Sequence, residues 1–329
     1  MVEGGRSISS PSEDPWTLEE KFIQNYGEVL RRNHDELVFQ CPECHHKALS
    51  CNVAKGVVFC FHCGFGRGRK ADPAASTTSN RPVIDRQLQL RVLEHVLDLY
   101  SISEEHRGYL AERGVYNPER YKIITVPVLM PEIHTLYSPK ELVDSGLWMR
   151  SNTGLRRKTV LGFNRILIPY WWAGQVVGFK TRADPKEDSS PKYLIPLGFS
   201  TSKQPWLFGD CGKDLIVTEG ELKAVAAYEV GLSAASVSGA NNYKCVSLLK
   251  QHTAGVRRYF VVYDVDPDPE VRGWVGRHAQ KVARLLGPNA CVVTLPFDGK
   301  KSEVDSFLVT FGAPLFVQYL ERCWYARKH

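Results

Sequence analysis

The second half of the chain alternates short apolar runs with segments of helical length. Beyond Asp214, LIVT, SAASV, RRYFVVY and ACVVTL have the composition of strands, and ELKAVAAYEV, a segment near 243–251 and residues 270–286 have that of helices. Such alternation is typical of a parallel sheet covered by helices on both faces. Ligands bind such sheets at the carboxyl ends of the strands.

The first half shows a mixed pattern. Helical spacing of apolar residues predicts one or two helices over 83–114, at Leu88, Val92, Val96 and Leu99. Residues 165–171 and 175–181 flank an Ala-Gly pair and predict a β-hairpin. We expect its ends to carry Lys180 and Arg182 outward.

Polar and Gly- or Pro-containing segments predict the domain boundaries. The first fifteen residues are polar, a helix is predicted from about Thr17 to Arg32, and GRGRKADPAASTTSNRP has the composition of a flexible linker. The predicted divisions are a tail and helix (1–36), a Cys-rich unit (37–70), a linker (71–82), a mixed α+β unit (83–205), a parallel-sheet unit (206–310) and a C-terminal helix (311–329).

Composition narrows the class of protein. No run of eighteen apolar residues occurs and the N-terminus lacks the apolar core of a secretory signal, so we expect a cytoplasmic protein without a membrane partner. The net charge is +6, and residues 140–210 carry about +5 of charge, which makes nucleic acid a candidate partner. No G-x-x-x-x-G-K-[ST] motif is present, which excludes a fused ATP-driven helicase of that type.

Four of the nine cysteines have the spacing of a metal site. Cys41 and Cys44 form one C-x2-C pair, and Cys60 and Cys63 form a second after fifteen intervening residues. This spacing is typical of a zinc ribbon. Four thiolates complete the tetrahedral shell of Zn²⁺, so the ion would be structural.

Acidic residues follow two predicted strands. Glu219 lies just after LIVT and is followed by Gly220, and RRYFVVY leads directly to Asp264 and Asp266. Carboxylates at strand ends can share Mg²⁺ or Mn²⁺ with water and substrate phosphate. Further candidates follow the next strand, Glu303 and Asp305.

Basic and aromatic residues are interleaved in the middle of the chain. Basic side chains can neutralise phosphates and aromatic rings can stack on unpaired bases. The candidates are Arg165, Lys180, Arg182, Lys192, Tyr193 and Lys203, with Trp171, Trp172 and Trp206 among them.

The chain resembles the bacterial DnaG-type primases and the primase part of phage primase-helicases over most of its length. FQCPECHH and SCNVAKGVVFCFHCGFG are similar to the primase zinc domain, with four Cys in place of the more usual three Cys and one His. HRGYLAERGV, FNRILIPYWWAGQVVGFKTR and PKYLIPLGFS are similar to the basic subdomain, although Ile195 replaces a polar residue of the family. Glu219-Gly220 and Asp264-Val-Asp266 match the Toprim motifs, and SEVDSFL is a degenerate third motif.

The resemblance implies a multidomain α/β protein with a four-cysteine zinc ribbon, a basic α+β subdomain and a Toprim domain. It implies a DNA primase that makes short RNA primers on single-stranded DNA from NTPs by two-metal nucleotidyl transfer, beside a separate replicative helicase. Glu219, Asp264 and Asp266 would be catalytic and would hold Mg²⁺ or Mn²⁺. Template and nucleotide would bind the basic residues, among them Arg182, Lys192, Tyr193 and Lys203.

Two other classes of function stay open. The degenerate third motif also suits a catalytically inactive nucleic-acid-binding module that recruits a helicase. A Toprim nuclease or topoisomerase would have the acidic motifs, but the combination with a zinc ribbon and a basic subdomain favours a primase.

Overall fold

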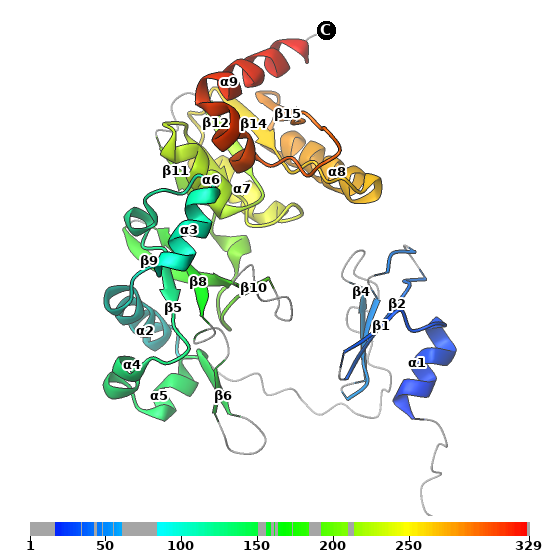
Figure 1. Cartoon of the computed structure of the whole chain (residues 1–329), viewed down its shortest axis with the longest axis vertical. Coiled ribbons are helices and arrows are strands. Elements are labelled where there is room, and N and C mark those ends of the chain that lie inside the picture. Colours follow the sequence, from blue (N-terminus) through cyan, green and yellow to red (C-terminus); the bar gives the residue numbers. More distant parts are fainter. Residues whose placement is uncertain are drawn as a thin grey trace, which may run out of the picture. The chain divides into compact units, whose positions relative to one another are not determined.

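A computed structural model describes residues 17–33, 35–42, 45–47, 49–54, 56–60, 84–150, 156–158, 161, 164–172, 174–183, 192–209 and 214–327. The chain divides into two compact units, Met1–Arg81 and Pro82–His329 (Figure 1). The predicted linker at 71–82 lies outside the described residues. No helix in these described ranges is long and apolar enough to cross a bilayer.

The first unit contains a helix and an antiparallel sheet. Helix α1 (Leu18–Tyr26) begins with a capping box at Thr17 and ends at Gly27, whose φ is +84°. Strands β1 (Arg31–Asn33), β2 (Glu36–Phe39), β3 (Leu49–Asn52) and β4 (Val57–Cys60) follow one another in the sheet. The predicted extension of the helix to Arg32 is wrong, because the chain turns at Gly27 and enters β1.

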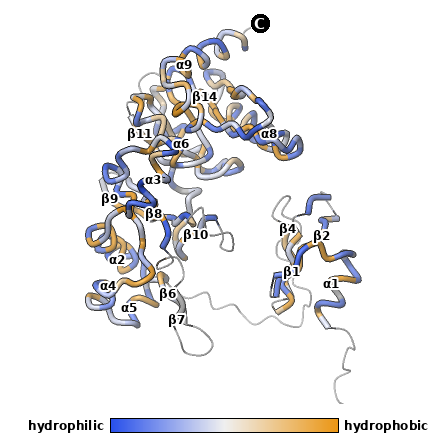
Figure 2. The backbone as a smooth tube through the Cα atoms, viewed as in Figure 1, coloured by the Kyte–Doolittle hydropathy of each residue, from blue (hydrophilic) through white to orange (hydrophobic). Residues whose placement is uncertain are grey.

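The second unit begins with helices packed on an antiparallel sheet. The helices are α2 (Arg86–Leu99), α3 (Glu104–Glu112), α4 (Pro131–Leu136) and α5 (Pro139–Asp144). The sheet has the order β10 (Tyr193–Leu194), β9 (Gln175–Arg182), β8 (Arg165–Trp172), β5 (Ile124–Val126), and β6 (Trp148–Arg150) pairs with β7 (Arg156–Lys158). Along α2, apolar and polar residues alternate (Figure 2), and its apolar side packs into the core.

The predicted hairpin is confirmed, but the predicted outward orientation of Lys180 and Arg182 is wrong. Strands β8 and β9 pair in antiparallel register with a bulge at Tyr170/Trp171. Lys180 and Arg182 were expected to point outward, yet their exposed fractions are only 6% and 8%. The expectation is wrong because the parallel-sheet region covers this face of the hairpin and supplies Glu221 as the partner of Lys180.

The predicted parallel sheet is also confirmed. Its order is β11 (Trp206–Phe208), β13 (Ala234–Ser236), β12 (Asp214–Thr218), β14 (Arg258–Val262), β15 (Ala290–Val293), with only β11 antiparallel to its neighbour among these strands. Helices α6 (Glu221–Glu229) and α9 (Val304–Ala326) pack on one face. Helices α7 (Tyr243–His252) and α8 (Pro269–Leu286) pack on the other.

The C-terminal helix begins earlier than the predicted 311. Helix α9 starts at Val304, after a cap at Glu303, and has a kink at Gly312, whose φ is +76°. Glu303 and Asp305 therefore lie at the start of α9, and Glu303 is close to the ends of β12 and β14.

Candidate functional site

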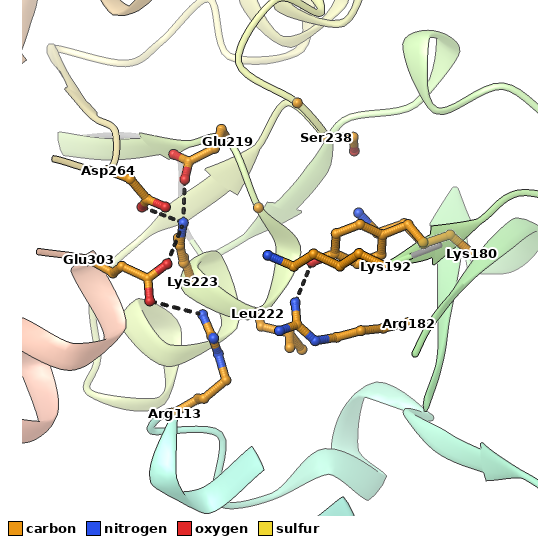
Figure 3. A pocket seen from close by; sticks show the side chains of 13 residues that line it. Arg113, Lys180, Arg182, Lys192, Glu219, Leu222, Lys223, Ser238, Asp264 and Glu303 are labelled. Carbon is orange, nitrogen blue, oxygen red and sulfur yellow. Dashed lines mark hydrogen bonds and ion pairs between the residues drawn. The ribbon is translucent and has the colours of Figure 1, made fainter. Parts of the chain in front are cut away.

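A cavity of about 260 Å³ opens at the carboxyl ends of β12 and β14, where the parallel sheet meets the antiparallel one. Three carboxylates line one side together with Lys223 and Arg113, and the other side carries the basic groups of Lys180, Arg182 and Lys192 (Figure 3). The lining residues are Arg113, Lys180, Arg182, Lys192, Tyr193, Glu219, Gly220, Leu222, Lys223, Ser238, Gly239, Asp264 and Glu303.

The carboxylates lie at the ends of two strands and at the start of one helix. Glu219 follows β12, where the Thr218 hydroxyl donates to the Gly220 carbonyl at 2.9 Å and α6 begins. Asp264 lies two residues after β14, and Glu303 caps α9. The predicted candidates Glu219, Asp264 and Glu303 thus lie together, although they are far apart in sequence.

A lysine that the sequence analysis missed lies at the centre of these carboxylates. The Lys223 ammonium donates to Glu219 and Asp264 and lies 3.4 Å from Glu303 (Figure 3). Lys301 adds contacts of 2.9 Å to Asp264 and 2.8 Å to Glu303. A signal was available in the sequence, because Lys223 is four residues after Glu219, a spacing that the start of α6 brings into contact.

Burial and nearby charges shift the pKa values of Glu219 and Asp264 in opposite directions. Burial raises the pKa of Glu219 to about 7, with the Asp264 charge adding to the rise and Lys223 opposing it. Burial also acts on Asp264, but the ammonium groups of Lys223 and Lys301 outweigh it and hold its pKa below the ordinary value. Near neutral pH, Glu219 is therefore able to accept or give up a proton, whereas Asp264 stays ionised.

The other two acidic candidates, Asp266 and Asp305, do not line the cavity. The Asp266 carboxylate accepts from the Asp268 amide at 3.0 Å and does not line the cavity. Asp268 caps α8 by accepting from the Glu270 amide at 2.8 Å. Asp305 is 2% exposed and pairs with Arg113, which also lies 3.9 Å from Glu303.

The basic side of the cavity is built on β9 and β10. Arg182 donates to the Tyr193 hydroxyl at 2.6 Å, while its Nε has no partner among the described residues. The Lys180 ammonium lies 4.2 Å from the centre of the Tyr193 ring and pairs with Glu221, which also accepts from Tyr170. Lys192 is exposed at the rim.

Several other residues that were predicted to bind nucleic acid belong to the protein interior or to the end of the hairpin. Arg165 is 1% exposed and donates to the Thr181 hydroxyl at 3.1 Å, so it holds β8 against β9. Trp206 is buried, whereas Trp171 and Trp172 are exposed at the end of the hairpin. Lys203 is the last residue of a 3-10 turn (Thr201–Lys203).

Ser238, which the sequence analysis also missed, lines the cavity in an unusual backbone conformation. Its φ is +57°, in the left-handed region that residues other than Gly seldom adopt. Its hydroxyl lies 2.9 Å from the Tyr170 hydroxyl, and the Gly239 amide donates to the Glu219 carbonyl at 2.7 Å. The loop after β13 is therefore held against the Glu219 turn.

In the first unit, two of the four predicted zinc ligands lie in the described part. Leu49 of β3 pairs with both Phe39 and Cys60, and Cys41 comes two residues after Phe39. Cys41 and Cys60 therefore lie at the same end of the sheet, and both are fully buried. Cys44 and Cys63 lie outside the described residues.

Bacterial primases have the same fold as this chain. The zinc-binding and RNA polymerase domains of the Aquifex aeolicus primase match it with a TM-score of 0.56 and 19% identity, over 94% of this chain and 83% of that one. The E. coli primase catalytic core matches with a TM-score of 0.56 and 18% identity, over 72% and 79%. A DnaG primase catalytic domain bound to ssDNA matches with a TM-score of 0.54 and 18% identity, over 72% and 81%.

Sequence comparison gives no match of this kind: no family model and no curated protein matches the chain. At 18–19% identity the structural matches establish the fold alone. The resemblance found in the sequence is confirmed at that level, because the multidomain α/β fold of this chain is that of the DnaG-type primases.

Proposed function

We propose that the chain is a DNA primase that makes short RNA primers on single-stranded DNA. The observation that carries the proposal is the cavity at the ends of β12 and β14, which combines acidic and basic walls within a DnaG-type primase fold. Phosphate-bearing substrates suit the basic wall, and nucleotidyl transfer needs acidic groups at the opposite side. In this proposal the parallel-sheet region is a Toprim domain.

The basic wall would bind the triphosphate of an incoming nucleotide. Arg182 is largely buried, is oriented by Tyr193 and has an Nε without a partner in the described part of the chain. A guanidinium held in this way can donate to phosphate oxygens with little loss of side-chain freedom. Lys192 at the rim would add charge, and the exposed rings of Trp171 and Trp172 would contact template bases.

Glu219 would act on the attacking hydroxyl. In this reaction the 3′-oxygen of one nucleotide bonds to the α-phosphorus of the next, the bond between the α- and β-phosphates breaks, and pyrophosphate leaves. The hydroxyl proton must also leave as the new bond forms. A carboxylate with a pKa near 7 can accept that proton at neutral pH. Asp264, which stays ionised, would balance the charge of Lys223 beside it.

The carboxylates fit one divalent ion better than two. Glu219, Asp264 and Glu303 converge on the buried Lys223 ammonium, and with that ammonium in place the described residues contain no group of three or more side chains that could hold a metal ion. Lys301 is 40% exposed and could give way to an ion. We therefore propose one Mg²⁺ or Mn²⁺ that Asp264 would hold in place of the Lys301 ammonium and that would stabilise negative charge on phosphate. Asp266 does not line the cavity, so its role as a second ligand stays a prediction from the sequence.

The first unit is proposed to be a zinc ribbon that contacts the template. Cys41 and Cys60 fit a structural Zn²⁺ site because both thiols are buried at one end of the sheet. Cys44 and Cys63 would complete four thiolates. A separate replicative helicase is the proposed partner, in a cytoplasmic setting.

A catalytically inactive binding module is the second candidate. The observation that favours it is the neutralisation of the acidic cluster by Lys223 and Lys301. Incubation of the protein with single-stranded DNA, Mg²⁺ or Mn²⁺ and labelled NTPs separates the two. A primase yields short RNA, an inactive module binds the DNA without product, and cut DNA would instead indicate a nuclease.

A further inference from the structure

The Lys223 ammonium lies where three carboxylates from different elements converge. Glu219 comes from the end of β12, Asp264 from the end of β14 and Glu303 from the cap of α9 (Figure 3). An ammonium has three N–H donors, which matches three carboxylate oxygens. A centre of this kind, with oxygens from several strand ends around one cation, is also what a divalent ion requires.

The two lysines of the cluster differ in burial. The Lys223 side chain is 8% exposed and begins in the first turn of α6, with its ammonium inside the cluster. The Lys301 side chain is 40% exposed and reaches Asp264 and Glu303 from the outside. Solvent can take up the Lys301 ammonium at little cost, whereas withdrawal of Lys223 would leave buried carboxylates without their counter-charge.

We propose that Lys223 is a built-in cation that takes the place of a divalent ion between Glu219, Asp264 and Glu303. While this ammonium is in place, the three carboxylates do not share a metal ion. The protein therefore binds one divalent ion fewer than the same carboxylates would bind without Lys223. The proposal concerns metal binding in the absence of nucleotide and DNA, so it can fail while primer synthesis is observed, and it can hold if no primer is made.

The test counts Mn²⁺ ions on the full-length, zinc-loaded protein by the loss of the free Mn²⁺ signal in electron paramagnetic resonance. Lys223→Gln keeps the length of the side chain but removes the charge, and it should add one Mn²⁺ per chain relative to the wild type. Glu219→Gln in the Lys223→Gln background should remove that added ion. Lys301→Gln is the matched control, since it contacts two of the same carboxylates from outside, and it should not raise the number of ions.

An equal number of bound Mn²⁺ ions in the wild type and in Lys223→Gln would overturn the proposal. If Lys223→Gln does not fold, Glu219→Gln in the wild-type background still decides the matter. Unchanged Mn²⁺ binding supports the proposal, because Glu219 is then a partner of Lys223 and not of a metal. A lost ion contradicts it.

Discussion

At the scale of single residues, the buried ion pair between Lys180 and Glu221 makes a prediction about stability. Glu221 is 1% exposed, and Lys180 holds its pKa below the ordinary value against the opposing effect of burial. Lys180→Met would leave a buried carboxylate without its partner, which costs about 3–5 kcal/mol. Urea denaturation should show this loss in the free energy of unfolding.

The matched control for that substitution is Lys192→Met, which changes the same residue type on the same wall. Lys192 is exposed, so its loss should change the free energy of unfolding by less than about 0.5 kcal/mol. Equal effects of the two substitutions would mean that the Lys180–Glu221 pair does not stabilise the fold. In that case a loss of DNA binding in Lys180→Met would reflect the lost charge and not a change in the fold.

Glu219 makes a prediction about pH. Its pKa is about 7 in the folded protein and close to 4.5 when unfolded, so the folded state holds the extra proton between these values. Stability from this group is complete below pH 4.5 and is lost as pH rises through 7. Glu219→Gln cannot lose that proton, so its melting temperature should rise relative to wild type between pH 5 and 8.

The melting temperatures of the wild type and Glu219→Gln above pH 8 serve as the control. Between pH 8 and 9 the Glu219 carboxyl is already ionised in both folded and unfolded wild type, so the difference in melting temperature should stay constant. A difference that is the same at pH 5 and pH 8 would contradict the raised pKa.

At the scale of elements, Gly178 of β9 makes close packing of Phe199 possible. A Cβ at Gly178 would overlap the Phe199 ring, which packs edge-on against Tyr170. Gly178→Ala should therefore lower the free energy of unfolding by about 1–3 kcal/mol. Gly108→Ala in α3 is the control, since a Cβ there meets nothing within 4 Å and a helical Ala is favoured by about 0.5–1 kcal/mol. Destabilisation by both would point to a general effect of the added methyl group.

Strand and helix positions were predictable from sequence because apolar periodicity reflects which side of an element is buried. The strands before Glu219 and Asp264 were found in this way, and so was the hairpin that carries Arg182. Burial of Lys180 was not predictable, because it depends on Glu221 from an element 41 residues away. The contact of Lys223 with Asp264 was not predictable either, because Asp264 is distant in sequence, but its spacing of four residues from Glu219 was a signal that the sequence did offer.

At the scale of the whole molecule, the division into two units predicts separate responses to metal removal. The first unit has a small core that includes Cys41 and Cys60, so loss of Zn²⁺ should unfold it. Chelation, or Cys60→Ser, should make residues 17–60 sensitive to protease while residues 84–327 stay protected. Survival of the first unit after complete zinc removal would contradict the zinc ribbon.

The proposed function depends on Asp264 more than on any other single carboxylate, because it is the ionised group beside Lys223 and the proposed metal ligand. Asp264→Asn removes that charge and should leave the basic wall intact. Asp268→Asn is its control, since Asn also caps a helix well. Single-stranded DNA binding should be unchanged in both variants and should weaken as salt rises.

The most direct measurement is therefore RNA primer synthesis from labelled NTPs on single-stranded DNA, compared between the wild type, Asp264→Asn and Asp268→Asn. The account predicts short RNA products from the wild type and from Asp268→Asn, and at least a hundredfold less from Asp264→Asn at about the same DNA affinity. A wild-type protein that binds DNA but makes no RNA, or an Asp264→Asn variant as active as the wild type, would contradict it.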